Sequence, residues 1–173
     1  MGAERRRTAI QEQLLMSTGP LTGQELAERL GVSRQVIVQD IALLRSSGVE
    51  ILATPRGYLL NRGTFGGIKR LIACCHKSDH VANELLTIVK LGGEVLDVIV
   101  EHPLYGEITG HLLLSTEEEV EEFVERLSRA KARLLSSLTD GVHLHTIRVP
   151  DLETHQTVTR ALEQKGYLLN DKS

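Results

Sequence analysis

The sequence predicts an α+β protein, in which a winged helix-turn-helix over residues 1–61 is joined by a linker at 62–67 to an open two-layer α/β domain at 68–173. Two observations predict this organisation. Apolar residues recur at helical spacing in the N-terminal part, and strand-like segments with alternating side chains are interspersed with helical segments in the rest of the chain. A length of 173 residues is sufficient for two small domains.

Composition and charge restrict the classes of function. No apolar run reaches the roughly 18 residues of a membrane span, and the start of the chain lacks the apolar stretch of a signal peptide. We therefore expect a cytoplasmic protein with no membrane partner. The net charge of −3 argues against a protein that coats nucleic acid, yet residues 1–60 carry seven arginines against six acidic residues, which leaves −4 for the remainder. This asymmetry favours an anionic partner at the N-terminal end.

Two helices are predicted before residue 31. The first covers residues 3–18 and ends near Gly19 and Pro20, because proline follows helix ends. Thr22 is placed to cap the second, with Glu25 three residues later as the reciprocal partner of a capping box. A tight turn then leads into a third helix, so the pattern is that of a helix-turn-helix.

The third helix, over about residues 34–47, carries the side chains predicted to read DNA. Ser33 caps it, and its isoleucines and leucines face inward. Arginine and glutamine make paired hydrogen bonds to guanine and adenine edges when such a helix enters the major groove of double-stranded DNA. The candidate base-contacting residues on the outer face are Arg34, Gln35, Val38 and Gln39.

A short β-hairpin is predicted after this helix. Its strands cover residues 51–54 and 58–60, and Arg56 lies at the tip, where the wing of a winged helix contacts phosphate or the minor groove. The alternative is a helical hairpin that only binds protein. The agreement of the turn, the polar helix face and the basic tip favours DNA.

The second domain is predicted to have the element order βαββαβαβ, with helices covering one face of the sheet. The predicted strands cover residues 70–76, 94–100, 106–114, 141–149 and 167–169, and the predicted helices cover residues 79–91, about 115–135 and 151–166.

Histidines provide the strongest chemical signal. His143 and His145 alternate on a predicted strand, so both imidazoles point to one face and supply half of a four-coordinate metal site. A polar row facing solvent explains the pair alone equally well. His76, at the end of the first predicted strand, and Glu84, on the following helix, are candidates to complete the site. His80 lies one helical turn before Glu84 and competes with these candidates, and spacing does not choose between them.

Cys74 and Cys75 are the only cysteines and are adjacent, which is poor geometry for a structural disulfide. They fit a reducing compartment. We interpret them as two small buried residues rather than as metal ligands.

Several segments resemble known families. Residues 22–60, especially 32–45, resemble the winged helix-turn-helix of biotin-operon-repressor-type regulators. His76 and residues 92–108 and 141–146 resemble the three-histidine (3H) domain of niacin-responsive transcriptional repressors. The resemblance implies a homodimeric repressor of NAD-biosynthesis and niacin-uptake genes, with a palindromic operator and nicotinic acid as co-repressor. It also implies a nickel or zinc ion held by His76, Glu84, His143 and His145.

Residues 101–106, which lie within the segments that carry the resemblance, are the second candidate site. A proline-containing connection flanked by a histidine, a tyrosine and an acid is typical of a pocket rim for a small aromatic acid. His102 and Tyr105 are the candidate ligand-binding residues. The alternative is turn chemistry plus one core tyrosine.

Two other functions are compatible with the sequence. In a metal-responsive regulator, nickel or zinc itself would be the signal. In a metalloenzyme, a metal with an open position would activate water. We expect no enzyme, because no further acid or base stands at a convincing spacing and Glu84 would already serve as a ligand.

Overall fold

The computed structural model describes residues 2–61 and 66–170, and the chain divides into two compact units between residues 64 and 65. Most of the predicted linker, residues 62–65, lies outside the described residues. In the part of the chain that is described, none of the helices combines the length and the apolar character needed to cross a membrane.

The first unit is a three-helix domain with a β-hairpin, which confirms the predicted winged helix-turn-helix. Thr22 and Glu25 form the predicted capping box, in which the threonine hydroxyl accepts from the Glu25 N–H and the Glu25 carboxylate accepts from the Thr22 N–H. Ser33 accepts from the Val36 N–H and starts the third helix. The elements are α1 (Ala3–Met16), α2 (Gly23–Leu30), α3 (Arg34–Ser46), β1 (Ile51–Thr54) and β2 (Gly57–Leu60).

One buried cluster holds this unit together and fixes the orientation of α3. Ile10, Leu26 and Ile37, one from each helix, are fully buried in it. The buried carboxylate of Asp40 on α3 accepts from Arg6 Nε on α1 at 2.5 Å. Because the inner face of α3 is committed to these contacts, its opposite face remains available to a partner.

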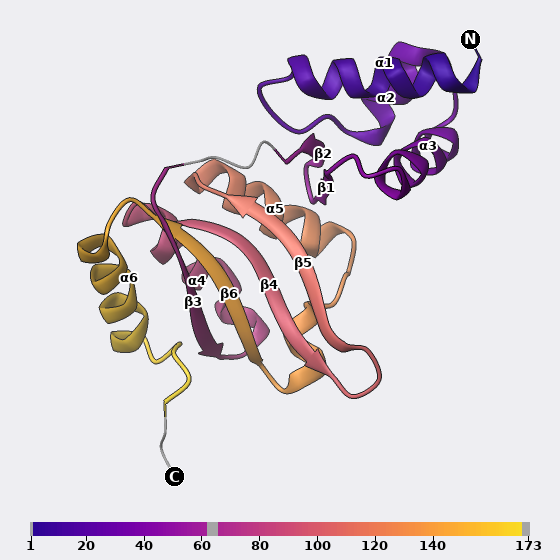
Figure 1. Ribbon diagram of the computed structural model, residues 1–173. Helices are drawn as coiled ribbons and strands as arrows, with labels where there is room; N and C mark the ends of the chain where they lie inside the picture. Colours follow the sequence, from indigo (N-terminus) through magenta and orange to yellow (C-terminus); the bar gives the residue numbers. More distant parts are fainter. Residues whose placement is uncertain (1, 62–65, 171–173) are drawn as a thin grey trace. The chain divides into compact units, whose positions relative to one another are not determined.

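The second unit is an antiparallel sheet with the strand order β3-β6-β4-β5. Figure 1 shows α4 and α5 behind this sheet and α6 beside β3. Leu85 of α4, Val120 of α5 and Leu162 of α6 share one buried cluster with the sheet residues Val95 and Ile147, as expected for a two-layer domain. The elements are β3 (Ile68–Cys75), α4 (Val81–Lys90), β4 (Glu94–His102), β5 (Gly106–Leu114), α5 (Glu117–Arg129), β6 (Val142–Val149) and α6 (Leu152–Gln164), with 3₁₀ turns η1 (Ser78–His80) and η2 (Leu135–Thr139).

Three predicted elements were wrong in extent. The helix expected to reach residue 135 ends at Arg129, because Lys131 adopts a left-handed conformation with φ of 48° that an α-helix does not allow. The strand expected at 167–169 is reduced to one bridge between Leu168 and Cys74. The segment before α4 forms the 3₁₀ turn η1, so α4 begins at Val81 rather than at residue 79.

Candidate metal centre

The structure brings the four predicted metal ligands together between the sheet and α4. His143 and His145 lie on the helix-covered face of β6 and are 4% and 3% exposed. Glu84, in the first turn of α4, is fully buried and faces them, and the side chain of His76 reaches the same place from the end of β3. The distances from each histidine Nε2 to the Glu84 carboxylate are 2.6 Å for His76, 3.1 Å for His143 and 3.5 Å for His145.

Backbone carbonyls orient all three imidazoles. Each Nδ1 faces a carbonyl oxygen, which only accepts hydrogen bonds, so each Nδ1 carries a proton. Each Nε2 is therefore the ring nitrogen that a metal ion would bind, and it faces the Glu84 carboxylate. The contacts are His76 Nδ1 to Lys77 O at 2.8 Å, His143 Nδ1 to Gly141 O at 2.8 Å, and His145 Nδ1 to Asp97 O at 2.6 Å.

This arrangement fits a divalent cation. Oε2 of Glu84, Nε2 of His76 and Nε2 of His145 are buried and have no hydrogen-bond partner. Although His76 Nε2 is close to the carboxylate, the two groups are not aligned as a hydrogen bond. Unsatisfied buried polar atoms are costly. Metal-bound histidines commonly donate their other ring N–H to a carbonyl, as all three do here.

The charges at the centre support the same interpretation. Burial raises the pKa of Glu84, but its interactions with His143, His145 and His76 outweigh burial and hold that pKa below its ordinary value. Burial by itself lowers the pKa of His76. The Glu84 carboxylate and the Lys77 carbonyl together raise that pKa by more than burial lowers it, so the net shift is upward. Glu84 is therefore an ionised oxygen donor surrounded by nitrogen donors.

Cys74, interpreted from the sequence as a small buried residue, lies beside the candidate ligands. It is fully buried on β3, directly opposite His143 on β6, while Cys75 is partly exposed. The Cys74 Sγ, a Glu84 carboxylate oxygen and a His143 ring nitrogen lie within 4.8 Å of one another. Burial, and then the negative charge of Glu84, raise the pKa of the Cys74 thiol. The available signal was the spacing of Cys74 and His76, two residues apart.

His80 lies outside this cluster. Its side chain is 49% exposed, and its Nε2 is 3.7 Å from Asp79 Oδ1. Its ring lies 5.5 Å from the ring of Tyr167, measured between centroids. His76, rather than His80, is therefore the histidine that faces Glu84.

One cavity adjoins the cluster, and a second cavity adjoins the first. A small one, of about 30 Å³, is lined by the three histidines and Glu84 on one side and by apolar residues such as Val98 and Leu112 on the other. A larger one, of about 830 Å³, shares Val81, Leu134 and Leu135 with the first and is also lined by Lys131 and Arg133.

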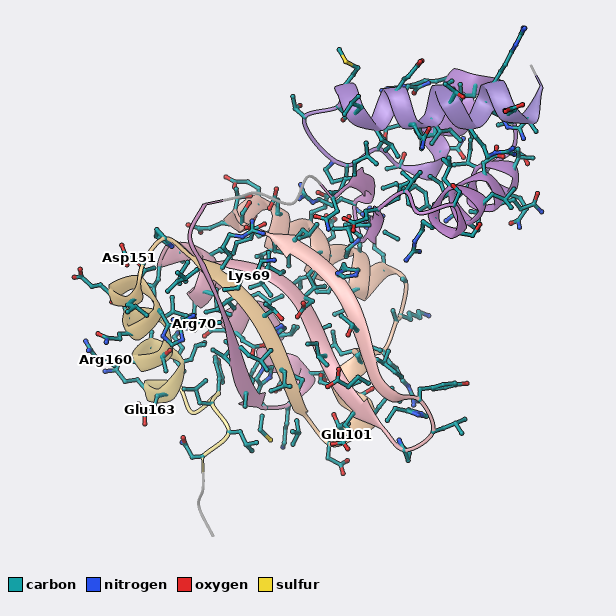
Figure 2. The ribbon with its side chains drawn as sticks, in the orientation of Figure 1. Lys69, Arg70, Glu101, Asp151, Arg160 and Glu163 are labelled. Carbon is teal, nitrogen blue, oxygen red and sulfur yellow. The ribbon has the colours of Figure 1, made fainter. Side chains whose placement is uncertain are left out.

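His102 and Tyr105 line neither cavity. They lie at the β4–β5 turn, next to Glu101, which Figure 2 shows at this end of the sheet. His102 Nδ1 accepts from the Leu104 and Tyr105 N–H groups, and Tyr105 is 72% exposed. These contacts are those of a turn.

The predicted DNA-reading residues lie on one face of α3 and on the wing. Arg34, Gln35 and Gln39 are exposed on α3, and Val38 is half-buried beside them. Arg56 lies in the turn between β1 and β2.

Comparison with known proteins identifies the family. Residues 6–59 match an HTH domain and residues 69–171 match the 3H domain. The chain is 50% identical to the "Probable transcription repressor NiaR" of Thermotoga maritima over 168 residues, which cover 97% of this chain and 95% of that protein. It is 43% identical to the "Transcription repressor NadR" of Bacillus subtilis over 178 residues, covering 99% of this chain and 96% of that protein. These relationships confirm the expectation of a DNA-binding regulator rather than an enzyme. The chain belongs to the family of transcription repressors that combine an N-terminal helix-turn-helix domain with a 3H domain.

Proposed function

We propose that this repressor controls genes of NAD biosynthesis and niacin uptake, with nicotinic acid as co-repressor and a nickel or zinc ion bound by His76, Glu84, His143 and His145. The observation that carries the proposal is the convergence of three histidine Nε2 atoms on the buried Glu84 carboxylate, within a chain that also has a helix-turn-helix domain. Nitrogen and carboxylate donors suit such borderline metals, and a bound ion would supply positive charge at the end of the small cavity.

The mode of DNA binding follows from the winged helix. We propose that Arg34, Gln35, Val38 and Gln39 contact base edges in the major groove, and that Arg56 contacts the backbone or the minor groove. A homodimer would place two recognition helices about one DNA turn apart on a palindromic operator. A DNA target and two free cysteines are both consistent with a cytoplasmic location.

The larger cavity is our proposed site for nicotinic acid. The cavity of about 30 Å³ beside the histidines has room for little more than a water molecule. The larger cavity is lined by Leu134 and Leu135, which also line the small one, and offers the cationic side chains of Lys131 and Arg133, which suit a carboxylate. Binding there would be linked to DNA affinity: if nicotinic acid tightens DNA binding, DNA tightens nicotinic acid binding by the same factor.

A titration of DNA affinity tests this function. The full chain, loaded with metal, is titrated onto a palindromic promoter fragment at fixed salt, with nicotinic acid, with nicotinamide or with neither. We expect nicotinic acid to tighten binding at least about fivefold, the lower end of typical coupling. Nicotinamide, which lacks the carboxylate, should have little effect, and a chelator should remove the response.

The same titration separates the alternative. A metal-responsive regulator is favoured by one observation, namely that four potential donors come together without an organic ligand. DNA affinity that follows metal concentration and ignores nicotinic acid would establish that alternative. Absence of DNA binding under all conditions would contradict both.

Substitutions on α3 and on the wing have different expected effects. Gln35→Ala should weaken operator binding by about 1–3 kcal/mol and leave non-specific DNA binding unchanged, because it removes a base contact. Arg56→Gln should weaken binding to all DNA sequences. It should also reduce the slope of log affinity against log salt concentration by about one, because one phosphate contact is lost. Fluorescence anisotropy at several salt concentrations, on operator and scrambled DNA, measures both.

A matched control for these variants is Gln156→Ala, which removes an exposed glutamine from α6 in the second unit. It should bind operator as the unsubstituted protein does. Wild-type operator affinity in Gln35→Ala would show that this residue does not read a base.

A further inference from the structure

The metal centre has a fifth potential donor on the sheet. The Cys74 Sγ, a Glu84 oxygen and a His143 nitrogen lie within 4.8 Å of one another. Two donors on one zinc ion are separated by about 3.5 Å at tetrahedral angles and about 4.4 Å at opposite positions. The three atoms can therefore reach one ion with only small movements of the side chains.

The strand register explains why the sulfur faces this point. Cys74 and His143 are directly paired across β3 and β6, so both side chains project from the same face of the sheet, toward α4. Three other buried polar atoms point into the same space without a hydrogen-bond partner. They are Oε2 of Glu84, Nε2 of His76 and Nε2 of His145.

We propose that Cys74 is a thiolate ligand of the metal, in addition to His76, Glu84, His143 and His145. This inference rests on the proposed metal centre. As the metal binds, the thiol proton is released to solvent and a sulfur lone pair forms the bond, because the cation offsets the negative charge of Glu84. Thiolate is a soft ligand and therefore favours zinc, cobalt or nickel over magnesium and manganese.

The neighbouring cysteine provides a matched control. Cys75 is the next residue of β3, so its side chain points to the opposite face, where it pairs with Val142 and is partly exposed. Cys74→Ser and Cys75→Ser thus make the same chemical change one residue apart. Only the first of them alters the metal centre.

Cobalt spectroscopy of the full chain tests the proposal. Cobalt(II) is titrated into the wild type, Cys74→Ser and Cys75→Ser, and absorbance is recorded from the near ultraviolet to the red. Wild type and Cys75→Ser should show a sulfur-to-cobalt charge-transfer band. Cys74→Ser should bind cobalt, as seen in its visible ligand-field bands, but lack that band.

The outcomes separate this proposal from the metal centre itself. Stoichiometric cobalt binding by the wild type without a charge-transfer band would overturn the assignment of Cys74 and leave the other four ligands standing. No cobalt binding at all would overturn the metal centre and this proposal with it. If Cys74→Ser fails to fold, X-ray absorption of the zinc-loaded wild type decides, since a sulfur ligand gives a shell at about 2.3 Å and its absence contradicts the proposal.

Discussion

Glu84→Gln should lower the affinity for zinc or nickel by at least about a hundredfold, because substitution of groups that merely support metal ligands already costs about 10- to 100-fold. The substitution preserves the size of the side chain and removes its charge. Glu84 is the residue toward which all three histidine Nε2 atoms point, so an amide there removes the anionic donor at the middle of the cluster.

Thermal unfolding with and without metal measures the effect. Metal at a hundred times its dissociation constant stabilises a folded protein by about 2.7 kcal/mol. The wild type should therefore melt several degrees higher with metal than with chelator, whereas Glu84→Gln should melt at nearly the same temperature in both. Calorimetric titration then gives the affinities directly.

The control is Glu118→Gln, which removes an equivalent charge from the exposed first turn of α5. It should keep the full metal-dependent rise in melting temperature. A rise of wild-type size in Glu84→Gln would show that the carboxylate is not a ligand.

Much of the fold was accessible from local patterns. The capping residues Thr22 and Ser33 located the starts of α2 and α3 correctly, because an N-cap side chain satisfies its own helix within three residues. Alternation along β6 placed His143 and His145 on one face for the same kind of local reason.

The parts of the site that local patterns do not determine depend on contacts between distant segments. Cys74 faces His143 only because β3 pairs with β6 in one register, and sequence pattern does not encode the register of strands so far apart in the chain. The choice between His76 and His80 depended on where α4 begins, and helix boundaries are poorly defined by periodicity. The carbonyl of Asp97 that orients His145 belongs to a third strand.

Gly141→Ala is expected to destabilise the protein and damage the metal centre together. Gly141 precedes β6 with φ of +92°, and a Cβ there would lie 2.4 Å from the carbonyl oxygen of His76. The unfavourable backbone conformation costs about 1–2 kcal/mol, and the displacement of a packed neighbour costs about 1–3 kcal/mol. The free energy of unfolding should therefore fall by about 3 kcal/mol.

The damage reaches the ligands because Gly141 holds two of them. Its carbonyl accepts from His143 Nδ1 at 2.8 Å and from the His76 backbone N–H at 3.4 Å. Relieving the clash would separate the end of β3 from the start of β6, and so move His76 away from His143. Metal affinity should fall about 10- to 100-fold, the effect expected when the supports of ligating histidines are disturbed.

Gly106→Ala separates backbone conformation from the close approach. Gly106 also has a positive φ, +77°, but nothing lies within 4 Å of the position of its missing Cβ. Its variant should lose only about 1–2 kcal/mol, the cost of the backbone conformation alone, and bind metal normally. Urea unfolding of the metal-free proteins, followed by metal titration, compares the two. Equal losses of unfolding free energy in both variants would mean that the backbone at His76 moves aside without cost. The approach of β6 to His76 would then not position the ligands.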